Sequence, residues 1–239
     1  MKPQMVIEDY RGQHNKLPSS ADRLIKGNTY KDLSTICIIP TRGMIPAKVV
    51  QNWMSLFSPM NQKFIRLFMI GMEVGEAYSH AIETIINNPD LKNWKYVLTL
   101  EEDNMPPPDG LLKLHESIKD YDAVGGLYWT KGEGGQPMIY GNPKEAPFNF
   151  IPQVPIPNAV QQCNGLGMGF TLFRIEMFKD PKIQRPLFKT VQEYTPGVGS
   201  SAFTQDLYFF QNAGRLGYRF ASDNRVLVGH YDINEDKTW

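Results

Sequence analysis

The sequence lacks the features that mark several large classes of protein. Its 239 residues include only two cysteines, Cys37 and Cys163, which are too few for a disulfide framework. Lys and Arg together number 25, as do Asp and Glu, so the net charge is zero and gives no strong signal for nucleic-acid binding. No apolar run approaches the ~18 residues of a membrane-spanning helix, and the first residues lack the apolar stretch of a signal peptide. We therefore expect a soluble, cytoplasmic protein.

The pattern of apolar residues predicts how the chain is organised. Residues 1–32 are polar and show no sustained period, so we expect an N-terminal extension there. Between residues 34 and 129, apolar runs alternate with helical patterns in the order β-α-β-α-β-α-β. Continuous apolar runs fit strands that are covered on both faces. We therefore predict one α/β domain over residues 33–239, with three layers and a mainly parallel central sheet.

The segments between the predicted strands differ in composition. Residues 131–157 are rich in Gly and Pro, and we expect them to lie over an active site, with an inter-domain linker as the alternative. Residues 194–201 have the composition of a flexible loop, so we predict a second active-site loop over residues 190–203. The helix after the first strand should pack on the sheet through five apolar residues at helical spacing: Val49, Val50, Trp53, Met54 and Phe57.

An acidic cluster follows the apolar run at residues 96–100. Glu101, Glu102 and Asp103 are consecutive, three prolines come soon after, and Asp109 can cap the next helix. Adjacent carboxylates repel one another unless a cation lies among them. The carboxyl ends of strands line the ligand crevice of open α/β sheets, where Mg²⁺ is held by one or two carboxylates and substrate phosphates. The cluster therefore predicts a metal–diphosphate site; a solvated acidic turn is the alternative.

Three other strand ends carry candidate residues. Arg42 follows the first strand and could approach a base or a phosphate, although an exposed loop arginine is an equal alternative. Gly165, Gly167 and Gly169 alternate in a way that suits close approach of the backbone to a ligand, without the dinucleotide fingerprint. His230 follows the last strand, where a surface histidine is the common alternative to a ligand for Mn²⁺ or a similar metal.

The first turn of one predicted helix carries another candidate residue. Thr204 can cap a helix that carries Asp206 in its first turn. A helix N-terminus favours the charged form of a carboxylate, so we expect the pKa of Asp206 to be lowered. Favourable placement near the helix dipole, worth ~0.3–1 kcal/mol, is the alternative explanation for an acidic residue there.

Taken together, these residues resemble the GT-A glycosyltransferases, especially their family 2-like group, over roughly residues 35–230. The resemblance implies the GT-A fold, a Rossmann-like fold of nucleotide-diphospho-sugar transferases. The matching segments are Ile39-Pro40-Thr41-Arg42-Gly43 for the nucleotide-binding strand, Leu100-Glu101-Glu102-Asp103-Asn104 with Pro107 for the D-x-D segment, Val124-Gly125-Gly126 for the following strand, Gln205-Asp206 for the E-D pair, and Gly229-His230 for the metal site. The chain departs from the pattern at Glu101, at Gln205, and in residues 75–80, which lack an Arg-Asn pair.

The resemblance implies a hexosyltransferase that moves a sugar from a nucleotide-diphosphate donor, most often a UDP-sugar, to an unidentified acceptor hydroxyl, with inversion. Asp103 and His230, with Glu101, would hold Mn²⁺ or Mg²⁺, Asp206 would be the catalytic base, and Trp129 would line the acceptor site. The implied nucleotide-sugar-binding residues are Pro40, Thr41, Arg42, Glu73, Glu101, Glu102, Gly165 and Gly167.

Two alternatives remain. A sugar-phosphate nucleotidyltransferase would use a similar fold and metal, but residues 40–43 match its glycine-rich basic loop poorly. A catalytically inactive nucleotide-sugar-binding module would account for the substitutions at Glu101 and Gln205.

Overall fold

The computed structural model describes residues 26, 32–60, 62–197 and 199–239, so the predicted extension at residues 1–32 lies almost wholly outside the described part. Strands and helices alternate in the predicted order. The elements are β1 (Thr35–Thr41), α3 (Ala47–Met54), β2 (Phe64–Ile70), α4 (Val74–Asn87), β3 (Tyr96–Leu100), α5 (Gly110–Ser117), the 3-10 turn η1 (Ile118–Asp120) and β5 (Ala123–Leu127).

The remaining part of the chain completes a seven-stranded sheet in the order β2-β1-β3-β9-β5-β12-β7. The added elements are β7 (Val160–Cys163), β9 (Phe170–Arg174), α6 (Ile175–Phe178), α7 (Gln205–Arg215) and β12 (Phe220–Leu227). Strands β1, β2, β3, β5 and β12 point the same way, whereas β9 and β7 run opposite to their neighbours. The sheet is therefore mixed and mostly parallel, and the carboxyl ends of its parallel strands meet at one edge.

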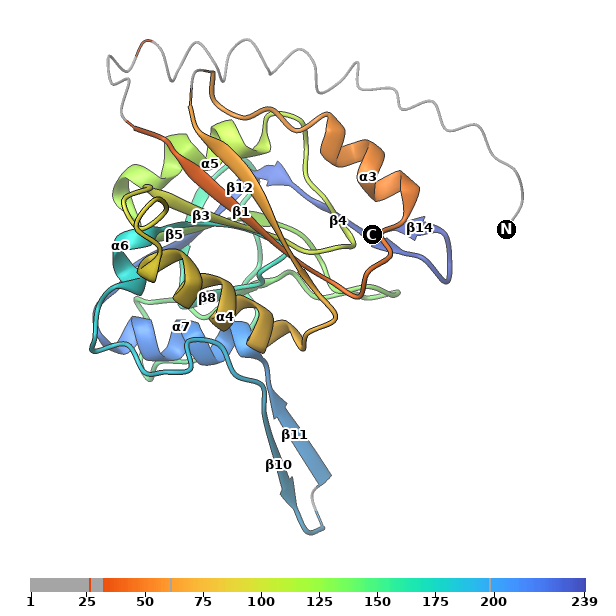
Figure 1. The fold of residues 1–239 in the computed structure, drawn as a ribbon. Helices are drawn as coiled ribbons and strands as arrows, with labels where there is room; N and C mark the ends of the chain where they lie inside the picture. The colour runs from red at the N-terminus through yellow and green to blue at the C-terminus, as the bar shows by residue number, and fades with distance from the viewer. Residues whose placement is uncertain (1–25, 27–31, 61, 198) are drawn as a thin grey trace.

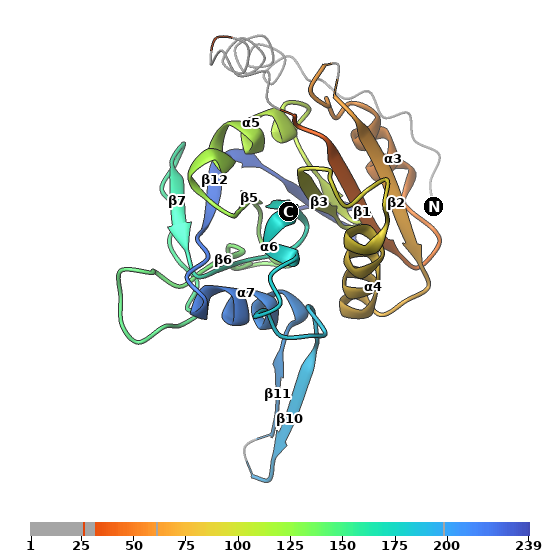
Figure 2. The ribbon, with the colours of Figure 1, turned by 60° about the vertical axis from the view of Figure 1, so that its left-hand side comes forward.

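Helices cover both faces of this sheet, as the predicted three layers require (Figures 1 and 2). On one face, Ala81 of α4 and Phe209 of α7 join a buried cluster with side chains from the strands. On the other, Trp53 of α3 and Leu111 of α5 join a second cluster. Among the described helices, none is long and apolar enough to cross a membrane.

The predicted packing face of α3 is only partly correct. Val49 and Trp53 are buried, but Val50 is 39% exposed, Met54 82% and Phe57 48%. Helix α3 spans only eight residues and touches the sheet along one side. Because 3.6 residues make a turn, Val50 and Met54 lie outside that narrow side and face away from the core, and Phe57 lies beyond the end of the helix.

The glycine-punctuated run at residues 160–173 is divided among three strands rather than forming one. Strand β7 lies at the edge of the large sheet against β12, and β9 lies between β3 and β5. Between them, β8 (Gly165–Leu166) pairs with β6 (Ile139–Tyr140), which lies within the predicted loop at residues 131–157. Gly165, Gly167 and Gly169 each lie against a side chain that a Cβ would overlap, so glycine allows close packing at these positions.

The predicted flexible loop at residues 194–201 is the end of a β-hairpin. Strands β10 (Val191–Thr195) and β11 (Gly199–Phe203) pair antiparallel and project from the body of the molecule (Figures 1 and 2). Gly197 and Gly199 take positive φ angles of 80° and 113°, which glycine adopts readily. Gly197 therefore lies in the turn, and Gly199 begins β11.

A small sheet, in the order β14-β13-β4, lies beyond the carboxyl edge of the large one. It consists of β4 (Asn104–Met105), β13 (Gly229–Asp232) and β14 (Lys237–Thr238). His230 lies opposite Asn104 in this sheet. The pairing brings the end of the last long strand to the acidic turn after β3.

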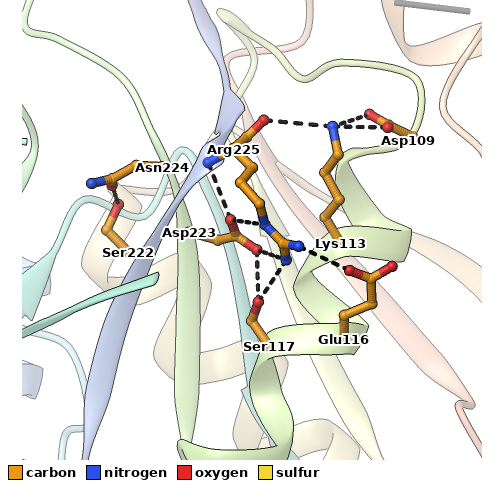
Figure 3. A network of polar contacts seen from close by, with 8 residues as sticks. All are labelled: Asp109, Lys113, Glu116, Ser117, Ser222, Asp223, Asn224 and Arg225. Carbon is orange, nitrogen blue, oxygen red and sulfur yellow. Dashed lines mark hydrogen bonds and ion pairs between the residues drawn. The ribbon is translucent and has the colours of Figure 1, made fainter. Parts of the chain in front are cut away.

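A buried polar network joins β12 to α5 (Figure 3). The fully buried carboxylate of Asp223 accepts hydrogen bonds from Nε of Arg225 at 2.8 Å, from Nη2 at 2.7 Å, and from the hydroxyl of Ser117 at 2.7 Å. The Arg225 guanidinium also reaches Glu116 at 3.1 Å. These bonds to Asp223, together with the nearby negative charges, raise the pKa of Arg225 and keep it charged.

The expectation that Asp109 caps α5 through its side chain was wrong. Asp109 occupies the cap position of α5 but makes no side-chain cap hydrogen bond. Its carboxylate instead pairs with the buried Nζ of Lys113 at 2.8 Å, one turn along the helix. Because a buried ammonium without a partner is costly, the Asp109 carboxylate pairs with Lys113 instead of accepting a backbone N–H at the start of the helix.

Replacing Asp223 by alanine should lower the free energy of unfolding by about 3–5 kcal/mol, because it leaves the Arg225 guanidinium without its main partner. Urea unfolding measures the change. Glu176→Ala is the control, since Glu176 pairs with Lys179 at the same 2.7 Å distance but is 69% exposed. That pair should contribute about 0–1 kcal/mol. Equal losses in the two variants would show that the Asp223 network is no more than a surface pair.

Candidate functional site

The candidate site lies at the carboxyl edge of the sheet, where the acidic turn follows β3. The β13–β4 pairing holds the turn in place, and the backbone N–H of Tyr231 donates to the carbonyl oxygen of Asp103 at 2.8 Å. Nε2 of His230 then lies 3.4 Å from Oδ2 of Asp103. The structure therefore brings together the two residues that were predicted from different ends of the chain as metal ligands.

A third residue, Lys131, contacts the same carboxylate oxygen. Its Nζ lies 2.6 Å from Oδ2 of Asp103. Burial alone would raise the pKa of Asp103, but hydrogen bonds from His230 and Lys131, and their charges, outweigh it and lower that pKa to about 2. Asp103 is therefore ionised at neutral pH.

The orientation of His230 is fixed by its other ring nitrogen. Nδ1 lies 2.8 Å from the carbonyl oxygen of Trp129, which can only accept, so Nδ1 carries the hydrogen. The ring also packs edge-on against Tyr128, with centroids 5.4 Å apart. Nε2 then faces Asp103: in the protonated ring it donates to the carboxylate, and in the neutral ring it presents a lone pair that a cation could accept. This backbone-anchored arrangement is typical of a histidine that binds a metal.

Asp103 and His230 fit a divalent cation whose shell is completed by a ligand. When the ring is neutral, two atoms that both accept, a carboxylate oxygen and the Nε2 lone pair, lie 3.4 Å apart and favour a cation between them. Within the described ranges, no group of three or more His, Cys, Asp or Glu side chains could hold a metal by itself. Mg²⁺ sites commonly use one or two carboxylates and substrate phosphates, so two protein ligands suffice.

Glu101, which was predicted as a third metal ligand, contacts Tyr78 of α4. Its Oε1 accepts a hydrogen bond from the hydroxyl of Tyr78 at 3.3 Å. Burial, with the negative charges of Asp103 and Asp206, raises the pKa of Glu101 to about 8. At neutral pH the group is mainly protonated, which reduces the repulsion within the acidic turn. A role for Glu101 on the metal or the nucleotide stays a prediction.

This raised pKa makes a stability prediction. Between the ordinary pKa of 4.5 and about 8, the folded state holds a proton on Glu101 that the unfolded state releases. Stability from this group is therefore fully present below the ordinary pKa and is lost as pH rises toward about 8. Glu101→Gln has no such proton to lose. Without metal, the melting temperature of the variant minus that of wild type should therefore increase as pH rises from about 5 to 8. A difference that does not change with pH would contradict the buried, protonated carboxyl.

Asp206 lies in the first turn of α7 and is only 5% exposed. Thr204 occupies the cap position without a side-chain cap hydrogen bond to the backbone. Burial raises the pKa of Asp206, although hydrogen bonds from Thr204 and the N–H of Leu207 oppose the shift. The expectation of a lowered pKa was wrong, because burial outweighs the helix terminus. The charge of Asp206 also helps to raise the pKa of Glu101, so the two carboxyls share one region of the site.

The end of β1 is tied to the acidic turn. Oε2 of Glu102 accepts hydrogen bonds from the hydroxyl of Thr41 at 2.7 Å and from the N–H of Arg42 at 2.9 Å. Its Oε1 accepts from Nε of Arg42 at 2.6 Å. Burial acts the other way, but these bonds lower the pKa of Glu102. The structure thus joins three of the predicted nucleotide-binding residues, next to Pro40.

The remaining predicted nucleotide-sugar-binding residues are Glu73, Gly165 and Gly167. Glu73 accepts the N–H of Glu76 at 2.9 Å as the cap of α4 and borders an open groove of about 1150 Å³ against residues 185–192. A Cβ on Gly165 would overlap Phe150, and one on Gly167 would overlap the Tyr128 hydroxyl. These contacts give both glycines a packing role. Their part in ligand binding stays a prediction.

Trp129, the predicted acceptor residue, is partly buried against the core cluster beneath α4 and α7. Its backbone carbonyl oxygen contacts the site and accepts a hydrogen bond from Nδ1 of His230.

Sequence reasoning missed Lys131, Tyr78 and Tyr128. Lys131 opens the glycine-rich run that follows β5, and a basic residue close to a strand end was the available signal. Tyr78 lies in residues 75–80, where the Arg-Asn pair is absent, but its contact with Glu101 depends on how α4 packs. Tyr128 lies in an apolar run and has no local signal beyond burial.

The comparisons with known proteins bear on the fold. No protein-family model and no curated protein matches the sequence. Among solved structures, A197 from STIV is similar, with a TM-score of 0.59 and 19% identity over 86% of this chain and 92% of that chain. The fold is GT-A-like. At this identity the likeness concerns the fold alone and does not distinguish family 2. S. aureus TarS 1-349 is more distant, with a TM-score of 0.43 and 12% identity over 81% of this chain and 60% of that chain.

Proposed function

We propose that this chain is a metal-dependent glycosyltransferase that moves a sugar from a nucleoside-diphosphate donor to an acceptor hydroxyl, with a UDP-sugar as the favoured donor. The observation that supports it best is the pair of facing acceptor atoms on Asp103 and His230, 3.4 Å apart, at the ligand-binding edge of a GT-A-like sheet. A diphosphate is the natural partner for a cation that has only two protein ligands.

In this proposal, Asp103 and His230 hold Mn²⁺ or Mg²⁺, which offsets negative charge on the departing diphosphate. The carbonyl of Trp129 keeps Nε2 of His230 directed at that position. The Thr41–Arg42–Glu102 contacts form the adjoining wall, where the guanidinium of Arg42, 86% exposed, can reach the nucleotide.

Asp206 is the proposed base. Its carboxylate takes the proton from the acceptor hydroxyl. The hydroxyl oxygen then attacks the sugar carbon on the face opposite the diphosphate, and the bond from that carbon to the diphosphate breaks. The configuration at that carbon is therefore inverted. A base works best when its pKa lies near the working pH, and burial shifts that of Asp206 in this direction.

A thermal-shift screen of nucleotide sugars, with and without Mn²⁺, tests the proposal. A UDP-sugar and Mn²⁺ together should raise the melting temperature more than either alone, because a ligand at 100 times its Kd adds ~2.7 kcal/mol of stability. No response to any nucleotide sugar would contradict the proposal. Binding without transfer or donor hydrolysis would indicate an inactive module, and product from a sugar 1-phosphate with a nucleoside triphosphate would indicate a nucleotidyltransferase.

A further inference from the structure

Lys131 is bound to the one carboxylate that the proposed cation requires. Its Nζ lies 2.6 Å from Oδ2 of Asp103, and the two side chains are 30% and 26% exposed. The same oxygen faces His230 at 3.4 Å. An ammonium and a divalent cation repel one another and cannot both bind this oxygen at full strength. Lys131 must therefore leave, or weaken its contact, when a cation arrives.

A closed loop holds Lys131 at this position. The N–H of Thr130 donates to the carbonyl of Gln136 at 2.9 Å, and the N–H of Gln136 donates to the Thr130 hydroxyl at 2.8 Å. The N–H of Gly135 donates to the carbonyl of Gly132 at 3.2 Å, and a Cβ on Gly135 would overlap the Thr130 carbonyl. The loop over residues 130–136 is thus a defined structure that requires glycine. The hydrogen bonds of this loop therefore fix the backbone position of Lys131.

We propose that Lys131 is an exchangeable cation of the donor site, bound to Asp103 when the site is empty and to the donor phosphates when a divalent cation occupies Asp103. This inference rests on the proposed function. The displaced ammonium stays next to the diphosphate that the cation brings, because its loop is fixed to the end of β5. Lysine suits the exchange, since its ammonium is a compact charge with three donors on a flexible stem and binds phosphate as a point charge.

The exchange makes two predictions of opposite sign for Lys131→Gln. Without nucleotide, the variant should bind MnCl₂ about tenfold more tightly than wild type, because the competing ammonium is gone. With Mn²⁺ saturating, it should bind UDP about tenfold more weakly, because one charged phosphate ligand is gone. Isothermal titration calorimetry measures both affinities. Lys144→Gln, an exposed lysine of the same segment, is the matched control and should leave both unchanged.

The signs of the two changes decide the inference. If the affinities for Mn²⁺ and for UDP both fall, Lys131 only supports the fold of its loop. If both stay the same, the Lys131–Asp103 contact is only a surface ion pair. Either result overturns the proposed exchange. If wild type binds UDP with Mn²⁺ and Lys131→Gln binds it equally well, the inference fails and the proposed function stands. If wild type binds none of UDP, GDP, CDP, ADP or dTDP, the proposed function fails, and the phosphate step of the exchange fails with it.

Discussion

Asp206→Asn should transfer sugar at least ~10²-fold more slowly than wild type while binding the nucleotide sugar with unchanged affinity. Asparagine keeps the size of the side chain but cannot take a proton from the acceptor. A base acts only in the chemical step, so its loss appears in kcat rather than in donor binding. Asp206 lies at the start of α7, and its charge acts on Glu101.

Donor affinity and turnover should be measured on one preparation, with Asp90→Asn, an exposed aspartate, as the control. The pKa of Asp206 is raised by burial, so wild-type kcat should fall as pH drops through that pKa, and the variant should lack this limb. Near-normal turnover of Asp206→Asn would mean that Asp206 is a helix-end residue. The base would then lie elsewhere, or the sugar would be transferred with retention and the leaving phosphate would take the proton.

Asp103→Asn should abolish Mn²⁺-dependent binding of UDP, with a loss of at least ~10²-fold. The amide lacks the charge that holds the cation, and it also removes the ionised partner of Lys131 and His230. His230→Ala should weaken binding less, because a neutral imidazole contributes no charge. Calorimetric titration of UDP with and without Mn²⁺ measures both effects.

Two controls make the Asp103 result specific. His80→Ala removes an exposed histidine of α4 and should change nothing. UDP affinity without Mn²⁺ should not fall in Asp103→Asn, so the loss must be confined to the binding that depends on Mn²⁺. An Asp103→Asn variant that binds Mn²⁺ and UDP as wild type does would exclude Asp103 as the metal ligand.

The parts of the fold that local sequence determines were predicted. Continuous apolar runs became β1, β3 and β5, and the order of elements placed Thr41 and Asp103 at the same edge of the sheet. The position of β9 was not predictable from its own residues. It runs antiparallel between β3 and β5, and that insertion depends on which edges are left open when the rest of the sheet forms.

The sequence predicted Asp103 and His230 as ligands of one metal; the structure brings them together, and their role on a metal stays a prediction. Asp103 was expected from the acidic turn, and His230 from its place after the last strand. Lys131 was missed because its contact crosses 28 residues and depends on the loop that follows β5. The direction of the Asp206 pKa was wrong because a helix terminus is visible in the sequence, whereas burial is a sum over elements from the whole chain.

We propose that Asp103 and His230 hold a cation on the donor diphosphate. A crystal structure of the wild-type chain with UDP and Mn²⁺, with the metal located by its anomalous scattering, tests it most directly. We expect one Mn²⁺ within about 2.0–2.2 Å of an Asp103 oxygen and of Nε2 of His230, with diphosphate oxygens completing its shell. A metal bound elsewhere, or UDP bound with Asp103 still paired to Lys131 and His230 turned away from the metal, would contradict the claim.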